Sequence, residues 1–471
     1  MKLRTYQSEL ITNISLALTK CKQIIATMPT GSGKTFTFAH IAKLATNNDL
    51  NTLIITDRIE LMNQTGGALE QVGLQPKLIE AGADSDLSGN CHIGMIETIN
   101  SRVKRTDTML KFLQSRNLII IDECHKANFD KLFQYLRTGV YVIGFTATPI
   151  RMGKRNMLKD YYCKIISGPG ISELQLSGYL CKSVTYGKPM DLSSVRVRGE
   201  DYDPEDQRRV YGKLQNFDGL YENMQRVARG KKTLIFCANV KASKELNSYL
   251  QSKGLRSAHL DGGLSKDERS DILDKFKSGE ITHLCSISVL TTGFDEPSIE
   301  CIVLYRATRS LPLYLQMCGR GGRPYPGKNT FSILDFGNNV SRFGYWEQDR
   351  EWSLSQKKID KLKKTGETPV KICYSCGAMI FASARVCRFC GHEMSLTKEQ
   401  IAYEKLIELH PKEIGKRELS VKELEAYRRE KAYKQGWLLR QLRNRSQFFE
   451  YAELMGYKKG WAWGMIKRYL T

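Results

Sequence analysis

The sequence of 471 residues contains no apolar stretch of the roughly 20 residues that a membrane-spanning helix needs. Its first residues, MKLRTYQSEL, contain no apolar signal core either. These absences predict a soluble intracellular chain, in the cytoplasm and associated with the nucleoid, or in the host cytoplasm if it is viral. Acidic residues are also in deficit, because 50 Asp and Glu stand against 72 Lys and Arg and leave a net charge of +22. That charge indicates a polyanionic partner, and nucleic acid is the first candidate.

Two stretches of the chain alternate short apolar runs with helical patterns, which predicts an α/β fold with two parallel-sheet lobes in tandem. The first lobe is expected at residues 1–190 and the second at residues 226–345, joined by a polar connection at residues 191–225. Strand signals then stop, and the Lys-rich residues 346–368 are expected to form a basic linker.

Paired cysteines are absent from most of the chain. Nine of the thirteen cysteines are scattered singly and are interpreted as reduced thiols that pack like small apolar side chains: Cys21, Cys91, Cys124, Cys163, Cys181, Cys237, Cys285, Cys301 and Cys318. The other four form two CxxCG knuckles, Cys373 with Cys376 and Cys387 with Cys390. Four thiolates suit a closed tetrahedral set, so residues 369–395 are predicted to be a structural zinc ribbon, with His392 a bystander. An iron centre is the alternative.

The run MPTGSGKT, from Met28 to Thr35, follows an apolar strand pattern and precedes a helical one. This is the context of a phosphate-binding loop, in which glycines let backbone N–H groups face phosphates. Lys34 would place a charge on the terminal phosphates, and the Thr35 hydroxyl would bind Mg²⁺. The alternative is a Gly-rich turn that arose by chance.

The run LIIIDECH places Asp122 and Glu123 at the carboxyl end of a very apolar strand, where parallel sheets bind ligands. Asp122 is predicted to hold Mg²⁺, and Glu123 to orient and deprotonate the attacking water of a phosphoryl transfer. The alternative is a pair of solvated acids at the end of a strand.

Three further motifs follow in order: TATP at Thr146–Pro149, TTGFDEP at Thr291–Pro297 and QMCGRGGR at Gln316–Arg323. Together with PTGSGKT and DECH, they make the chain resemble the superfamily 2 helicases of the DEAD/DEAH-like group over about residues 1–340. With its cysteine cluster and Gly-Trp tail, the chain also resembles the RadD-like helicases and their phage-encoded relatives. The resemblance implies two RecA-like lobes, ATP, Mg²⁺ and Zn²⁺ as cofactors, and ATP hydrolysis coupled to movement on nucleic acid.

Site residues are carried over from these motifs as follows. ATP binding is expected of Arg4, Gln7, Pro29, Thr30, Gly31, Ser32, Gly33, Lys34, Thr35, Gly293 and Asp295. Catalysis is expected of Lys34, Asp122, Glu123, Gln316, Arg320 and Arg323, with the last two as arginine fingers supplied by the second lobe. Coupling of hydrolysis to movement is expected of His125, Thr146 and Thr148.

Nucleic-acid contacts are implied at Arg58, Gln64, Thr98, Thr291 and Thr292, on loops that follow strands. Arg58 could equally be a helix-start residue that faces water. DNA is favoured over RNA by resemblance alone, because DECH, TAT and QxxGRxxR differ from the DEAD, SAT and HRxGRxGR pattern of the RNA-unwinding DEAD-box enzymes.

The tail at residues 396–471 is expected to be helical and basic. Its last part, residues 431–471, contains nine Lys or Arg against two Glu, and it repeats a Gly-Trp motif at Gly436-Trp437 and Gly460-Trp461. These aromatic residues could stack on bases or form the corners of helical hairpins. The expected partner is nucleic acid, and the resemblance favours DNA, single-stranded or branched. Repair or replication proteins are the further partners considered for this C-terminal part.

These features predict an ATP-dependent DNA helicase or translocase of repair, recombination or replication. The alternatives are a translocase that remodels branched DNA without unwinding it, an RNA helicase and a nucleic-acid-binding scaffold. A motor subunit of a restriction complex is a further alternative, although the sequence contains no evident nuclease cluster of carboxylates and lysine.

Overall fold

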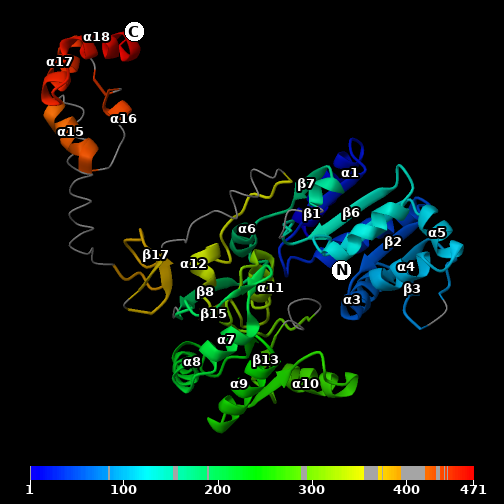
Figure 1. Ribbon diagram of the computed structural model, residues 1–471. Helices are drawn as coiled ribbons and strands as arrows, with labels where there is room; N and C mark the ends of the chain where they lie inside the picture. The colour runs from blue at the N-terminus through cyan, green and yellow to red at the C-terminus, as the bar shows by residue number, and fades with distance from the viewer. Residues whose placement is uncertain are drawn as a thin grey trace. The chain divides into compact units, whose positions relative to one another are not determined.

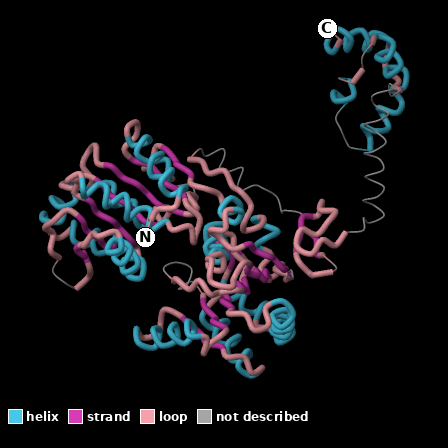
Figure 2. Tube along the Cα trace, turned by 180° about the vertical axis from the view of Figure 1, so that it is seen from behind, coloured by secondary structure: helices cyan, strands magenta, loops and turns pink. Residues whose placement is uncertain are grey.

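The computed structural model describes residues 2–82, 85–151, 157–187, 190–287, 294–354, 370–373, 375–393, 420–430, 435–439, 441–442 and 444–470. The chain divides into two compact units, Met1–His392 and Glu393–Thr471. Figures 1 and 2 show two sheets with flanking helices in the first unit, and helices in the second. Among the described residues, no helix is long and apolar enough to span a membrane.

The first sheet has seven strands in the order β3-β4-β2-β5-β6-β1-β7, and all of its pairings are parallel. In sequence order the strands are β1 (Gln23–Thr27), β2 (Thr52–Thr56), β3 (Lys77–Ile79), β4 (Cys91–Met95), β5 (Leu118–Asp122), β6 (Tyr141–Thr146) and β7 (Lys164–Ser167). Consecutive residues of an apolar strand such as β5 face opposite sides of a sheet, so the sheet needs cover on both faces. The predicted parallel lobe is confirmed.

Helices cover the two faces of this sheet. Residues of α1 (Thr5–Leu18), α2 (Lys34–Asn47) and α3 (Ile59–Gln71) pack into the core on one face. Residues of α4 (Ile96–Val103), α5 (Asp107–Gln114) and the 3₁₀ helix η1 (Ala127–Tyr135) pack into the core on the other. Two short elements, η2 (Leu158–Asp160) and α6 (Ile171–Leu176), flank β7 in sequence.

The second sheet has six parallel strands in the order β12-β13-β11-β14-β15-β8. They are β8 (Lys182–Gly187), β11 (Thr233–Cys237), β12 (Ser257–Leu260), β13 (His283–Ser286), β14 (Cys301–Tyr305) and β15 (Thr330–Asp335). The helices α7 (Pro204–Tyr211), α8 (Leu214–Val227) and α9 (Val240–Ser252) contribute to the core on one face. On the other face, α10 (Lys266–Ser278), α11 (Leu311–Gly319) and α12 (Asn339–Phe343) do so.

The division between the lobes lies earlier than the expected boundary at residue 190. Strand β8 pairs with β15 over its whole length, so the second sheet already contains residues 182–187. Residues 191–225 are also not an irregular connection, because they include α7 and most of α8 as well as a hairpin of β9 (Val197–Arg198) and β10 (Asp201–Tyr202). Tyr211 of α7 is 1% exposed, which makes this segment part of the second core.

The start of the expected basic linker is packed and not a free linker. Tyr345 and Trp346 are each 1% exposed, and both belong to the same core cluster as residues of both lobes. The aromatic side chains of this segment are large apolar groups, and their burial stabilises a packed conformation although the neighbouring residues are polar. The rest of the expected linker, residues 355–368, lies outside the described residues.

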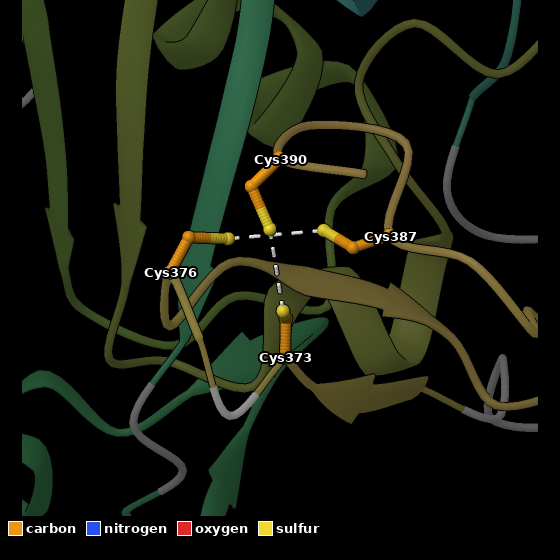
Figure 3. Close-up of side chains that lie close together, drawn as sticks. All are labelled: Cys373, Cys376, Cys387 and Cys390. Carbon is orange, nitrogen blue, oxygen red and sulfur yellow. Dashed lines mark hydrogen bonds between the residues drawn. The ribbon is translucent and has the colours of Figure 1, made fainter. Parts of the chain in front are cut away.

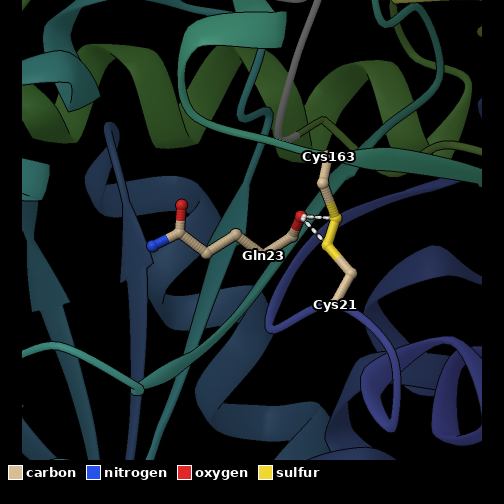
Figure 4. The surroundings of a disulfide bond; sticks show 3 residues. All are labelled: Cys21, Gln23 and Cys163. Carbon is tan, nitrogen blue, oxygen red and sulfur yellow. Dashed lines mark hydrogen bonds between the residues drawn. A yellow bond between two sulfur atoms is a disulfide. The ribbon is translucent and has the colours of Figure 1, made fainter.

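One prediction about the cysteines is wrong. The structure joins Cys21 and Cys163 by a disulfide, with their Cα atoms 6.6 Å apart (Figure 4). The two residues flank the first residues of the paired strands β1 and β7, so the parallel register brings them together although 142 residues separate them. No local pattern in the sequence predicts such a pair. The seven other scattered cysteines are buried free thiols, as predicted.

The second unit has a core of its own. Its described helices are α15 (Val421–Glu430), α16 (Gln435–Leu439), α17 (Arg445–Leu454) and α18 (Lys459–Tyr469). Leu424, Leu438, Phe448 and Ile466 are among the buried side chains that hold these helices together. The two copies of the Gly-Trp motif lie in α16 and α18.

Candidate functional site

The predicted phosphate-binding loop connects β1 to α2 at the carboxyl end of the first sheet. Gly31 has φ +88° and Gly33 has φ +83°, a region of backbone conformation that favours glycine. Gly33 is the N-cap residue of α2, so the first N–H groups of this helix are directed at the loop. An anion placed there would meet both these donors and the positive end of the helix dipole.

The N-cap residue and the first turn of α1 contact this loop from one side. The Tyr6 hydroxyl donates to the Ser32 carbonyl at 2.7 Å, and Gln7 Nε2 donates to the Gly33 carbonyl at 3.2 Å. The Arg4 guanidinium lies 4.8 Å from the centre of the Tyr179 ring. The structure therefore brings Arg4 and Gln7 to the loop, and it adds Tyr6 and Tyr179. Tyr6 could have been found within LRTYQ, whereas no motif contains Tyr179.

Lys34 contacts both acids of the DECH motif. Its Nζ atom lies 2.6 Å from Glu123 Oε1 and 3.3 Å from Asp122 Oδ1. Burial disfavours the charge of Lys34, but the two carboxylates outweigh it and raise the pKa of the amine. Burial raises the pKa of Asp122. Burial acts on Glu123 in the same direction, but Lys34 and His125 overcome it and hold the pKa of that carboxyl low. Glu123 is thus an ionised group, as a general base must be.

A short chain of polar contacts links Glu123 to the TATP motif. His125 Nδ1 lies 3.3 Å from Glu123 Oε2 and 2.8 Å from the Thr146 hydroxyl. The Thr146 hydroxyl donates to Glu123 at 3.4 Å and accepts from the backbone N–H of Thr148 at 3.0 Å. Glu123 itself has φ +52°, an uncommon conformation for a residue other than glycine, which marks the turn as specifically constrained.

Arg151, which sequence reasoning missed, stabilises the backbone of this turn. It is 6% exposed and forms an ion pair with Asp130 at 2.7 Å. It also donates to the carbonyls of His125 at 2.8 Å and Lys126 at 3.0 Å. An arginine two residues after TATP was visible in the sequence, but nothing there indicated that it would reach the residues after Glu123.

The second lobe contributes the arginine pair. Arg320 is 5% exposed, and both Arg320 and Arg323 donate to the Phe294 carbonyl. Arg323 also forms an ion pair with Asp295, and a Cβ atom on Gly31 would lie 3.3 Å from Arg323 Cγ. Burial, with the nearby charge of Arg323, lowers the pKa of Arg320 to about 9. The pair therefore lies against the phosphate loop of the other lobe, and both guanidinium groups remain charged at neutral pH.

Gln316 lies one turn before Arg320 in α11. It is 6% exposed, and its Nε2 atom is buried without a hydrogen-bond partner among the described residues. A buried amide nitrogen without a hydrogen-bond partner carries a desolvation cost, which a hydrogen bond to a ligand could relieve.

The phosphate loop, the two acids of the DECH motif and the arginine pair line one cleft of about 550 Å³. Its walls include Arg4, Thr30, Gly31, Gly33, Lys34, Thr35, Asp122, Glu123, Asp295, Arg320 and Arg323. Pro29 also lines it, whereas Ser32 is fully buried beneath the loop. The cleft combines donors for phosphates, two carboxylates and guanidinium groups from the opposite lobe, which is the set that phosphoryl transfer uses. Thr35 and Asp122, both in its walls, offer oxygen ligands suited to Mg²⁺.

The expected nucleic-acid contacts are distributed over different places. Gln64 lines the same cleft as Lys34 and Glu123. Arg58 is the N-cap residue of α3, and its charge acts on Arg320. Thr98 lines a groove of about 440 Å³ together with Arg102 and Arg105. Thr291, Thr292 and Gly293 lie outside the described residues.

The four clustered cysteines converge as a metal site requires (Figure 3). All four sulfur atoms lie within 4.8 Å of one another, and two of the pairs, Cys373 with Cys390 and Cys376 with Cys387, are 3.7 Å apart. Tetrahedral zinc with Zn–S bonds of about 2.3 Å places its sulfur ligands about 3.8 Å apart. The backbone N–H of His392 lowers the pKa of Cys390 to about 7, which favours a thiolate. The residues therefore fit zinc.

The zinc module is not separate from the second lobe. Its hairpin consists of β16 (Val370–Ile372) and β17 (Met379–Phe381). Met379 is 4% exposed and lies against Gly187 at the end of β8, where a Cβ atom would collide with its sulfur. Arg388 forms an ion pair with Glu347, and Phe381 packs against Tyr345 with ring centroids 4.7 Å apart.

Comparison with known proteins agrees with this geometry. Residues 1–151 match the family described as "Type III restriction enzyme, res subunit", and residues 213–325 match "Helicase conserved C-terminal domain". A 51.5 kDa protein of a Lactococcus phage (isolate 7-9) is 29% identical over 394 residues, which cover 82% of each chain. The putative ATP-dependent helicase IRC3 of Saccharomyces cerevisiae is 29% identical over 364 residues, which cover 71% of this chain and 51% of the yeast protein. The chain thus spans about half the length of that relative.

Among solved structures, the fragment of a putative HsdR subunit of a type I restriction enzyme from Vibrio vulnificus YJ016 has the same fold. Its TM-score is 0.58 at 23% identity, and the match covers 73% of this chain and 67% of that fragment. The two family matches contain the phosphate loop and the arginine pair, one in each lobe. Together, the two matched domains and these relatives support an ATP-hydrolysing helicase of superfamily 2, of the DEAD/DEAH-like group.

Proposed function

We propose that this enzyme is a DNA-dependent ATPase that uses the closure of its two lobes to move along, unwind or remodel DNA. The observation that supports this proposal best is the single cleft in which Lys34 and Glu123 of the first lobe meet Arg320 and Arg323 of the second. Because the two halves of the catalytic set come from different lobes, hydrolysis requires the lobes to be together. Binding and release of nucleotide would therefore drive opening and closing.

Within this cleft, each group has a distinct part. Lys34 exchanges its contacts with the carboxylates for the terminal phosphates of ATP. Thr35 and Asp122 would hold Mg²⁺, which would neutralise charge on those phosphates when bound. Glu123, released from Lys34, orients the attacking water and takes its proton. Arg320 and Arg323 stabilise the charge of the transferred phosphoryl group, with Gln316 beside them.

Contacts of Glu123 supply a route from hydrolysis to movement. Glu123, His125 and Thr146 share hydrogen bonds, and Arg151 fixes the backbone that follows them. A change in the charge or partner of Glu123 therefore reaches the TATP motif directly. We assign His125, Thr146 and Thr148 to this coupling.

We propose DNA as the substrate because the motif forms DECH, TAT and QxxGRxxR differ from those of the RNA-unwinding DEAD-box enzymes. Arg58, Thr98, Thr291 and Thr292 are proposed to contact the strand. Gln64 is proposed to act from the wall of the cleft, where it can sense nucleotide and strand together. The zinc module and the basic helical unit would add affinity for DNA or for a repair or replication protein. The second candidate is a translocase that remodels branched DNA without processive unwinding.

The test is an ATPase assay with single-stranded, duplex, forked and RNA cofactors, followed by strand separation on the best substrate. We expect DNA to stimulate turnover more than RNA does. Arg323→Ala should lower the stimulated rate by about a thousandfold or more, as the loss of an arginine finger does. Equal stimulation by RNA would favour an RNA helicase, and near-normal turnover of Arg323→Ala would remove that residue from the proposed role.

A further inference from the structure

Two glycines separate the arginines of the second lobe, and the structure shows why they are glycines. Neither Gly321 nor Gly322 has a positive φ, so backbone conformation does not require them. The reason is space. A Cβ atom on Gly322 would lie 2.5 Å from Cη2 of Trp346, and one on Gly321 would collide with the Phe331 ring. Real Cβ atoms do not come so close to other atoms, so the two rings occupy the space that side chains would need.

These two rings form a common support. The centroids of Phe331 and Trp346 are 5.3 Å apart with an interplanar angle of 81°, an edge-to-face contact. Both side chains are 1% exposed. The backbone between Arg320 and Arg323 therefore rests on a rigid aromatic pair, one ring from strand β15 and one from the segment that follows the second lobe.

The segment that carries Trp346 is itself held tightly. Arg350 donates to the carbonyls of Phe343 at 3.0 Å, Tyr345 at 2.9 Å and Trp346 at 3.3 Å, so it fixes the backbone on both sides of the indole. The hydroxyl of Ser172, in the first lobe, donates to the Asp349 carboxylate, whose two oxygens lie 2.6 and 2.7 Å from it. The segment thus connects the first lobe to the support beneath the arginine pair.

We infer that Trp346 is a positioning residue for Arg320 and Arg323, acting through Gly322. The indole fixes the position of the backbone turn at Gly322. This turn determines where the two guanidinium groups lie relative to the phosphate loop. This inference rests on the proposed function, because it matters for turnover only if the arginines act on the terminal phosphate. A displacement of about 1 Å in such a group can cost on the order of a hundredfold in rate.

If Trp346 positions the arginines, the effect of a larger side chain at residue 322 should be offset by a smaller ring at residue 346. Gly322→Ala should push the turn off the indole and lower kcat by on the order of a hundredfold, with little change in the KM for ATP. Trp346→Phe removes the part of the ring that the new methyl group meets. The double variant should therefore recover at least about tenfold of the rate that Gly322→Ala loses.

Matched controls separate this effect from a general loss of structure. Gly262→Ala, also in the second lobe, adds a methyl group that would meet no atom within 4 Å and should leave kcat unchanged. Tyr345→Phe changes the neighbouring aromatic residue, whose hydroxyl has no hydrogen-bond partner among the described residues, and should do the same. Binding of a fluorescent ADP analogue and thermal unfolding would show that each variant is folded and binds nucleotide.

A second double-mutant cycle, which combines Gly322→Ala with Arg323→Ala, distinguishes failure of this inference from failure of the proposed function. If Trp346 and Gly322 act through the arginines, Gly322→Ala should cost little more in an Arg323→Ala background. The inference is wrong if the double variant with Trp346→Phe is no faster than Gly322→Ala alone. It is equally wrong if Gly322→Ala costs the same factor in both backgrounds. Near-normal turnover of Arg323→Ala by itself would instead contradict the proposed role of the arginine.

Discussion

Lys34 and Glu123 form an ion pair of 2.6 Å in which the two side chains are only 13% and 8% exposed. The proposed phosphate-binding cation and the proposed general base thus neutralise each other across the cleft. Because the pair is buried, neither group can lose its partner without a replacement charge. ATP phosphates offer that replacement to Lys34, which would free Glu123 only when a substrate is present. Such a link would limit wasteful activation of water.

The first prediction follows from this ion pair. Glu123→Gln should lower kcat by on the order of 10²–10⁴-fold, the usual contribution of a general base, while nucleotide binding is retained because Lys34 is intact. Lys34→Ala should abolish turnover and weaken nucleotide binding as well. Steady-state kinetics with binding of a fluorescent nucleotide would measure both effects. Equal losses of nucleotide affinity in the two variants would contradict the division of roles.

The second prediction concerns Arg151 and Asp130. Arg151→Leu should destabilise the protein by about 3 kcal/mol or more, because it leaves the Asp130 carboxylate buried without its partner. Urea unfolding followed by circular dichroism would measure the loss. The double variant Arg151→Leu with Asp130→Leu should recover part of that stability. If the two losses simply add, the ion pair does not determine the stability of this turn.

Much of the cleft was predictable because its residues occur in short continuous motifs. Lys34 and Glu123 each follow an apolar strand, and parallel strands bring their carboxyl ends to one edge. Arg323 was predictable from its motif. By contrast, Tyr179, Arg151 and Trp346 reach their partners through the fold and have no local pattern of their own. The disulfide of Cys21 and the early start of the second lobe were missed for the same reason, since both depend on which distant strands become neighbours.

The third prediction concerns the zinc module. Purified protein should contain one zinc per chain, and Cys376→Ser or a strong chelator should release it. Because Met379 is buried against β8, loss of the metal should also destabilise the second lobe, by roughly 2 kcal/mol for one apolar side chain of this size. Metal analysis and thermal unfolding would test both statements.

The control for this experiment lies within the same knuckle. Ser375→Ala changes an exposed neighbour of Cys376 and should keep both zinc and stability. Bound iron in place of zinc would overturn the assignment of the metal. Unchanged stability of the second lobe after zinc loss would show that the module does not depend on its metal to cover β8.

The last prediction tests whether the basic helical unit binds DNA. Deleting residues 431–471 would remove Phe448 and Ile466 from a core that α15 also shares, so the deletion would expose apolar surface as well as remove charge. A sharper variant replaces three exposed cations near α18, Lys458, Lys467 and Arg468, by glutamine. Trp463, which is 50% exposed in the same helix, remains available to stack on a base.

If all three cations contact phosphates of a single strand, the slope of log affinity against log salt should flatten by about two units, at roughly 0.7 per contact. Maximal ATP turnover at saturating DNA should survive, because the substitutions leave every group of the cleft unchanged. The matched control replaces Lys20, Lys159 and Lys164, three exposed cations near the amino ends of β1 and β7, and should leave the salt slope as it was. These residues lie at the edge of the sheet opposite the phosphate loop, where no DNA contact is expected. An equal slope for the α18 variant and the unmodified protein would reject DNA binding by this surface and leave it as a candidate site for a protein partner.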